Sequence, residues 1–243
     1  TQNNTKFFWD NTNYRLGVNT GAPNTTLSIV SNTQTAPPST LSLPSGTDFY
    51  ILGADDTPTR ITQDAYGTGN YSVYTGRQAR GTAASPTATQ TGDILVQFTG
   101  RGYYTTTTPG FSSQSIGRID IDAAENFTDT AQGTYISLYT TALGATNSSE
   151  KFRIGPSGQL GIGGATYGAS GYVFTSGGAS AAPTWSQVSL SAGVTGTLPA
   201  TNGGTGQSLY AVGDLLYADT TTSLAKLADI ATGNVLLSGG VST

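Results

Sequence analysis

Apolar and polar residues alternate with a period of two in several short runs of the chain. In the run from Asp93 to Thr99, one face carries Ile94, Val96 and Phe98. The same alternation sets Ile119 and Ile121 against Arg118, Asp120 and Asp122, and Ile136 and Leu138 against Tyr135, Ser137 and Tyr139. Because Gly, Asn, Asp and Pro separate these runs, the pattern predicts a central antiparallel β-sandwich or barrel-like domain over residues 48–164.

The first thirty residues predict a β-hairpin. An aromatic run at 7–9 is followed by the polar turn 10–13 and a second short strand that reaches Val18. A two-stranded hairpin is marginal alone in water, so we expect the hairpin of residues 1–30 to pack against other chains or against upstream sequence. Residues 31–47 carry Pro37, Pro38 and Pro44 among Ser and Thr, and this composition predicts an extended linker.

Residues 165–243 are rich in Gly, Ala, Ser and Thr and contain a repeat. The stretch Gly171–Ser180 recurs as Gly233–Ser242, with six identities in ten positions. Self-similarity of this kind is typical of stacked architectures, in which each unit buries its apolar face against a neighbour. We therefore expect a repeat-containing β shaft that is incomplete at its C-terminal end, in a chain that is a piece of a longer polypeptide.

One stretch in this region has a helical pattern. Between residues 223 and 231, the apolar residues Leu224, Leu227, Ala228 and Ala231 are spaced at i, i+3, i+4 and i+7. Since so short a helix is unstable without packing, we expect one or two turns at most.

The composition favours β structure and oligomerisation. Only 10% of the residues are charged, while the chain has 33 Gly, 13 Tyr and 8 Phe. Aromatic and β-branched side chains pack well on a pleated surface. With so little apolar material per residue, a monomer has difficulty burying a core, so the composition predicts a homo-oligomer in which neighbouring chains pair the edge strands.

Charge and residue usage exclude several function classes. The net charge is −4, which gives no electrostatic basis for binding the phosphate backbone of a nucleic acid. We therefore expect no nucleic-acid binding. No run of 18 apolar residues is present, so we expect no membrane insertion. Without His or Cys, a Ser-His-Asp triad, a disulfide framework and the usual zinc sites are excluded, and we expect no cofactor.

Carboxylates are the remaining candidates for catalysis or metal binding. A polysaccharide-cleaving pair would come from Asp55 and Asp56, or from Asp120, Asp122 and Glu125. Asp120, Asp122 and Glu125, together with Asp129, are candidate Ca²⁺ ligands, although no Asp-x-Asp-x-Asp-Gly loop is present. The alternation instead indicates that Asp120 and Asp122 form the solvated face of a strand. We therefore expect neither a catalytic nor a metal site, and no enzymatic activity.

The best candidate for binding is the uncharged loop from Tyr103 to Ser115. It combines the aromatic residues Tyr103, Tyr104 and Phe111 with hydroxyl groups such as that of Thr106. Aromatic faces beside hydroxyls suit sugar surfaces, and loops on rigid β scaffolds often carry function. The alternative, which we favour, is that the aromatic residues pack between subunits and the threonines form a plain hairpin.

Three segments resemble bacteriophage tail-fibre and related receptor-binding fibre proteins. The first is 15–23, with a partial echo at 152–163, and is similar to short units that recur along phage fibres. The second is 77–86, followed by Gly92–Leu95 and Gly100–Tyr103. The third is the C-terminal repeat with residues 182–185, 202–206 and 213–218. The second segment resembles a β domain of fibres that often end in a self-cleaving intramolecular chaperone.

The resemblance implies an extended, mostly β homotrimer in a virion tail fibre. Such an appendage attaches to other tail or baseplate proteins and contacts a glycan or protein on the host cell surface. After Tyr103 the chain departs from the family pattern, because residues 104–110 replace an acidic-Gly turn. Two alternatives stay open at this point: a polysaccharide-degrading tailspike with paired carboxylates, and a bacterial surface appendage or adhesin.

Overall fold

The computed structural model describes residues 6–31, 42–105, 109–189 and 195–228. The chain divides into two compact units, Thr1–Tyr167 and Gly168–Thr243, which are described separately. Apart from one 3-10 turn at Ala200–Asn202, all regular structure in the described residues is β-strand. The predicted mostly β class is therefore confirmed.

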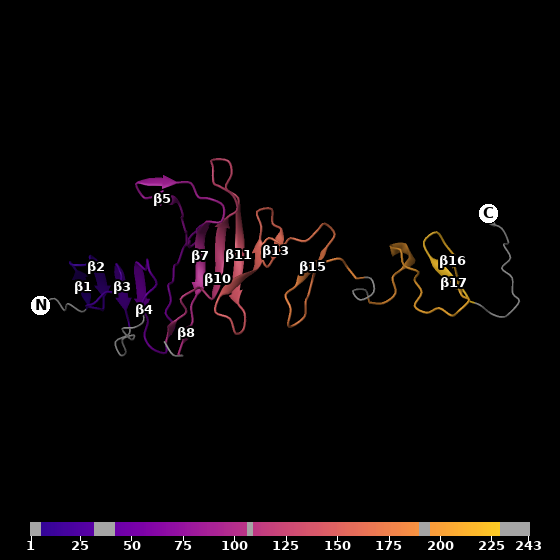
Figure 1. Ribbon diagram of the computed structural model, residues 1–243, viewed down its shortest axis with the longest axis horizontal. Coiled ribbons are helices and arrows are strands. Elements are labelled where there is room, and N and C mark those ends of the chain that lie inside the picture. Colours follow the sequence, from indigo (N-terminus) through magenta and orange to yellow (C-terminus); the bar gives the residue numbers. More distant parts are fainter. Residues whose placement is uncertain (1–5, 32–41, 106–108, 190–194, 229–243) are drawn as a thin grey trace. The chain divides into compact units, whose positions relative to one another are not determined.

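Unit 1 begins with a four-stranded sheet in the order β1 (Phe7–Asp10), β2 (Arg15–Val18), β3 (Leu27–Val30) and β4 (Phe49–Leu52). The first two strands form the predicted hairpin, whose turn is held by hydrogen bonds from the backbone N–H groups of Thr12 and Asn13 to the Asp10 carboxylate. β3 and β4 add to the hairpin in parallel (Figure 1). The hairpin is thus supported within its own chain, which the sequence pattern did not indicate.

The central part of unit 1 is a five-stranded antiparallel sheet, drawn in Figure 1 around β7, β10 and β11. Its order is β13 (Leu160–Ile162), β12 (Ser148–Ile154), β11 (Thr134–Thr141), β10 (Gly117–Ala123) and β7 (Ile94–Gly100). The alternating runs of the sequence therefore form strands, as predicted. In the described chain this sheet is a single layer, where we expected a sandwich or a barrel.

One face of this sheet is apolar and uncovered. Ile119 lies opposite Phe98 and Leu138, and Ile121 lies opposite Val96 and Ile136. A bulge between Ile121 and Asp122 shifts the register, so Ile94 pairs with Asp122 and leaves the row in which we placed it. Among the described residues, the buried apolar side chains are only those of Pro23 and Ala123. We call the side of the sheet that carries Val96, Phe98, Ile119, Ile121, Ile136 and Leu138 the apolar face.

The opposite face carries a polar network. Asp120 accepts hydrogen bonds from Arg118 Nε at 2.7 Å and Gln97 Nε2 at 2.9 Å, and Asp122 accepts one from Ser137 Oγ at 2.7 Å. Both carboxylates are almost completely buried, so the expectation that they form a solvated strand face is wrong. The reason is that long side chains lie across this face: Arg118 stacks on Tyr139, and Arg153 stacks on Tyr135.

Unit 2 contains two hairpins among its described residues. β14 (Val173–Thr175) pairs with β15 (Thr184–Ser186), and the rings of Phe174 and Trp185 meet edge to face at 5.4 Å. β14 lies in the first copy of the repeat, whereas the second copy lies outside the described residues.

The second hairpin corrects the helix expected at residues 223–231. β16 (Leu215–Ala218) pairs with β17 (Leu224–Leu227), in a register that places Leu215 opposite Leu227. The helical prediction is therefore wrong for residues 224–227, and residues 229–231 lie outside the described part. Strand pairing satisfies the backbone groups of this stretch, which a helix of one or two turns cannot do without packing.

Candidate functional site

The predicted binding loop forms a small hairpin, β8 (Tyr103–Tyr104) with β9 (Gly110–Phe111). Tyr103 lies opposite Phe111, and their rings meet edge to face with centroids 5.5 Å apart. Tyr104, opposite Gly110, is exposed like both members of this pair. The structure thus brings three of the four predicted residues together at the surface, while Thr106 lies outside the described residues.

A pocket of about 790 Å³ adjoins this hairpin and is bounded on the other side by β4 and the residues around it. Its lining combines aromatic rings, hydroxyl groups and one guanidinium; the residues that matter here are Tyr50, Thr59, Arg101, Phe111 and Ser112. Phe111 is the predicted residue that the pocket includes. Tyr50 and Arg101 were missed, because the sequence alone did not indicate that β4 lies beside the hairpin.

The polar groups of the pocket are only partly engaged within the chain. Ser112 Oγ is buried and has no hydrogen-bond partner, although the Ser112 carbonyl accepts a bond from Arg101 Nη1 at 3.3 Å. Burial raises the pKa of the Tyr50 phenol, so this group stays a neutral hydroxyl at physiological pH. An aromatic wall with neutral hydroxyls and one fixed cation suits a polyhydroxylated ligand, which needs ring stacking and hydrogen bonds together.

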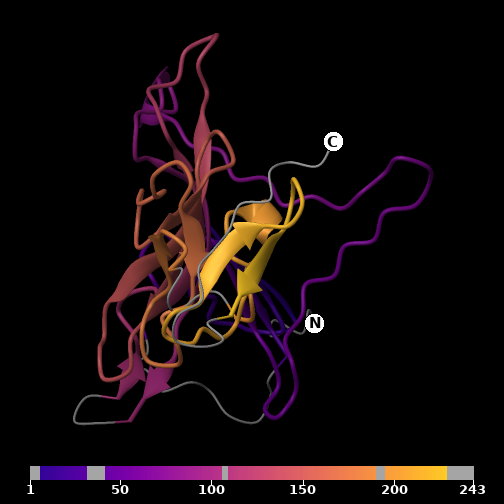
Figure 2. The ribbon, with the colours of Figure 1, turned by 90° about the vertical axis from the view of Figure 1, so that its right-hand side faces the viewer.

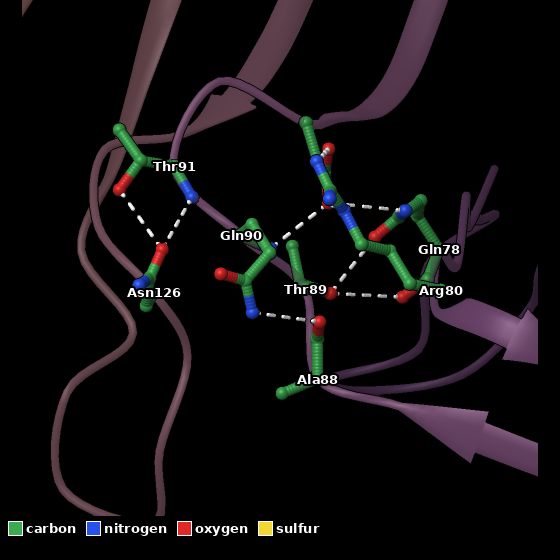
Figure 3. Close-up of polar contacts among 8 residues, drawn as sticks. Gln78, Arg80, Ala88, Thr89, Gln90, Thr91 and Asn126 are labelled. Carbon is green, nitrogen blue, oxygen red and sulfur yellow. Dashed lines mark hydrogen bonds and ion pairs between the residues drawn. The ribbon is translucent and has the colours of Figure 1, made fainter.

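A second polar cluster is formed by residues of the segment that resembles phage fibres (Figure 3). Arg80 binds both oxygens of the Asp93 carboxylate at 2.7 Å, and Gln78 Nε2 donates to the same carboxylate at 3.3 Å. The hydrogen bonds from Arg80, together with one from the Gln90 backbone N–H, lower the pKa of Asp93 to about 2.

The same cluster fastens neighbouring loops. Thr89 Oγ1 donates to Gln78 Oε1 at 2.8 Å, and Asn126 Oδ1 accepts bonds from the backbone N–H and the hydroxyl of Thr91, as Figure 3 shows. The cluster thereby ties the hairpin of β5 (Arg80–Thr82) and β6 (Ser85–Thr87) to the start of β7. These motif residues thus have a structural role, since their polar groups bind one another.

Three of the carboxylates considered for catalysis or calcium, Asp120, Asp122 and Glu125, are engaged in other contacts. Asp120 and Asp122 lie on one strand within the polar network, and Glu125 Oε1 accepts a hydrogen bond from the Gly133 N–H at 2.6 Å. No group of three or more acidic, His or Cys side chains suited to a metal ion occurs in the described ranges. Within those same ranges, no helix is long and apolar enough to span a membrane.

Comparison with solved structures identifies the fold. No protein-family model matches the chain, and no curated protein matches its sequence. A solved structure of the carboxy-terminal domain of the bacteriophage T5 L-shaped tail fibre, with its intramolecular chaperone domain, aligns over 90% of the chain at 15% identity and a TM-score of 0.51.

The chain spans 56% of that structure's own chain. A second structure of the carboxy-terminal domain of the same fibre aligns over 47% of this chain and 41% of its own, at 16% identity and a TM-score of 0.35. The alignment over 90% of the chain confirms for the fold the resemblance found in the sequence: this chain has the fold of a bacteriophage tail-fibre domain.

Proposed function

We propose that the chain is a structural segment of a bacteriophage tail fibre that works as a homotrimer, attaches the virion to its host and has no catalytic activity. The fold supports this proposal, because it matches a tail-fibre domain over most of the chain. The sequence supports it independently through the Gly-rich and Thr-rich composition and the absence of His and Cys.

The observation that carries the proposal is the uncovered apolar face of the five-stranded sheet. Burying an Ile, Leu or Phe side chain contributes about 1.5–3 kcal/mol, so a row of such residues left in water forgoes much of the stability available to the chain. A contiguous exposed apolar surface marks an interaction site. Copies of the chain that associate through this face supply each other with the missing core.

The assembly is tested by measuring the mass of the purified chain in mild buffer by light scattering and native mass spectrometry. We expect three times the chain mass of 24.8 kDa. A stable monomer would contradict the proposal, and a dimer would contradict the trimeric arrangement.

We further propose that the β8–β9 hairpin and the adjoining pocket form the receptor-binding surface, with Tyr103, Tyr104, Thr106 and Phe111 as contact residues. The pocket supports a host cell-surface glycan as the ligand, because the aromatic ring of Phe111 lies beside hydroxyl groups and Arg101. Other tail or baseplate proteins would hold the fibre on the virion.

Binding of the fluorescently labelled protein to host cells tests this surface. We expect Phe111→Ala to weaken binding about tenfold, in line with the loss of an aromatic anchor. Tyr14→Ala, which removes another exposed aromatic side chain of unit 1, is the matched control and should bind normally. Equal binding by both variants would place the receptor site elsewhere, and loss of binding after protease treatment of the cells would indicate a protein receptor.

The absence of catalysis is tested by incubating the protein with purified surface polysaccharide of the host. We expect the polysaccharide to keep its chain length. Shortening that disappears in Asp122→Asn would establish the tailspike alternative, and detection of the protein on bacterial cells in the absence of phage would establish the adhesin alternative.

A further inference from the structure

Between β4 and β5 the chain forms a long arm, residues 54–77, in which every residue is exposed. Figure 2 shows it as the purple loop that reaches out from the rest of unit 1. No strand lies within the arm, and a hydrogen bond from Ser72 Oγ to the Gln63 carbonyl at 2.9 Å links its two legs. The arm is therefore not part of any sheet of its own chain.

The composition of the arm is unlike that of a segment that stays free in water. Large apolar side chains are exposed along both legs: Tyr66 at 84%, Tyr71 at 78%, with Ile61, Val73 and Tyr74 each above half. Segments that remain free in solution are usually poor in aromatic and β-branched residues. These five side chains indicate that the arm is covered when the protein works.

The base of the arm lies on the apolar face. A Cβ placed on Gly76 would come within 2.5 Å of Val96 Cβ, so the backbone of Gly76 packs directly on the Val96 side chain. Val96 lies opposite Ile121 on the apolar face, and β7 is an edge strand of the sheet. The arm therefore departs from the rim of the surface that is itself uncovered.

The arm does not cover the apolar face of its own chain. Both are exposed in the same structure: the arm along its whole length, and Phe98, Ile119 and Leu138 on the sheet. In a symmetric assembly the same two surfaces are presented by every copy, so the arm of one copy and the apolar face of the next are available to each other.

We infer that the arm crosses to a second copy of this chain and packs its apolar side chains on that copy's apolar face. This inference rests on the proposed homotrimer and adds the contact that holds it together. The arm acts as a strap: it covers the row around Ile119 and Leu138 in the neighbour, and its own unpaired backbone lies beside that neighbour's sheet. Exchange of such a segment between identical protomers is a low-cost route to oligomers.

The chain has no Cys, so a single introduced thiol can be labelled cleanly. We place a benzophenone label on Val73→Cys, irradiate the intact protein, separate the products on denaturing gels and map the linked peptides by mass spectrometry. The matched control is the same label on Asn147→Cys, an exposed position in the turn between β11 and β12. Light scattering is recorded on the same labelled samples.

We expect Val73→Cys to yield covalent dimers and trimers several-fold more abundant than Asn147→Cys does, with the linked peptides falling in β10 and β11. Products of monomer size only, or label that reacts with solvent alone, would overturn the inference. If light scattering still shows a trimer in that case, the proposed function stands and the strap is wrong. If light scattering shows a monomer, the proposed assembly itself fails.

A second variant tests whether the strap contributes to stability. Replacing residues 60–75 with a short Gly-Ser segment keeps the pocket residue Thr59, Gly76 and the sheet intact. We expect the shortened protein to dissociate at a lower temperature and at a higher dilution than the parent. Unchanged dissociation would overturn the inference.

Discussion

Ile119 of β10 lies directly opposite Leu138 of β11, yet both side chains are exposed, at 45% and 38%. Neighbouring apolar residues at the centre of a sheet are normally its core, so this pair marks the surface that needs a partner.

We expect Leu138→Asp to prevent assembly. In the proposed trimer it buries an unpaired carboxylate in each copy, at a cost of about 3 kcal/mol or more per chain. Light scattering should show dissociated chains. Ala142→Asp adds the same charge in the exposed turn after β11 and should leave the mass unchanged; a Leu138→Asp protein of unchanged mass would contradict the interface.

Asp122 gives the stability of unit 1 a pH dependence of defined sign. Burial raises its pKa in the folded chain, although the hydrogen bond from Ser137 opposes this. The folded state then binds the proton more tightly than the unfolded state. Stability is therefore expected to fall as pH rises from the ordinary value of 3.8 through the raised pKa.

Asp122→Asn removes this charge and keeps an oxygen that accepts from Ser137. We expect the variant to be more stable than the parent at neutral pH and to lose the falling part of the pH profile, as measured by denaturant unfolding across that range. A parent and variant with parallel profiles would refute the assignment to Asp122.

The contribution of Asp93 to the pH dependence of stability has the opposite sign. The pKa of Asp93 is lowered to about 2 by Arg80, so its contribution is present above 3.8 and is lost as pH falls from 3.8 toward 2. At neutral pH, Asp93→Asn should speed hydrogen exchange in the β5–β6 hairpin without affecting β11. Asp129→Asn, an equal change of charge at an exposed loop position, is the control. Unchanged exchange in β5 and β6 would mean that Asp93 does not fasten this hairpin.

Gly168 allows the chain to pass against Trp185 in unit 2. A Cβ at Gly168 would lie 2.6 Å from Trp185 Cγ, and the φ of +74° is unfavourable for other residues. We expect Gly168→Ala to destabilise unit 2 by about 2 kcal/mol and to shift the fluorescence of Trp185, measured with Trp9→Phe in both proteins.

Gly178→Ala separates the backbone strain of a positive φ from the steric clash with Trp185. Gly178 has a similar φ of +81° but open space where the Cβ would be. Gly178→Ala should destabilise unit 2 less than Gly168→Ala does and leave the fluorescence emission of Trp185 unchanged. Equal emission in both alanine variants would contradict the close contact.

Period-two alternation predicted the strands of the central sheet because each strand has one apolar and one polar side. It did not predict which side is buried. The usual assumption places Ile119 inside and Asp120 in water, whereas Arg118 and Arg153 cover the carboxylates and leave the apolar side open. Two long side chains decide this outcome, Arg118 on β10 itself and Arg153 on β12, and the position of Arg153 depends on the strand register.

Local sequence also could not place the pocket. Phe111 was selected for its aromatic ring among hydroxyl residues, but its neighbours Tyr50 and Thr59 come from another part of the chain. The helix expected near Leu224 failed for a related reason, since pairing with β16 is a non-local contact that outweighs a short helical pattern. The arm was unnoticed because its composition resembles that of the strands around it.

The burial of only two apolar side chains, Pro23 and Ala123, among the described residues has a consequence for how the protein reaches its working state. A newly made chain has almost no hydrophobic interior to collapse around, so most of that driving force becomes available only when copies meet. Denaturation of unit 1 should therefore respond to dilution: at lower protein concentration the melting temperature falls, as mass action requires when the folded state depends on association.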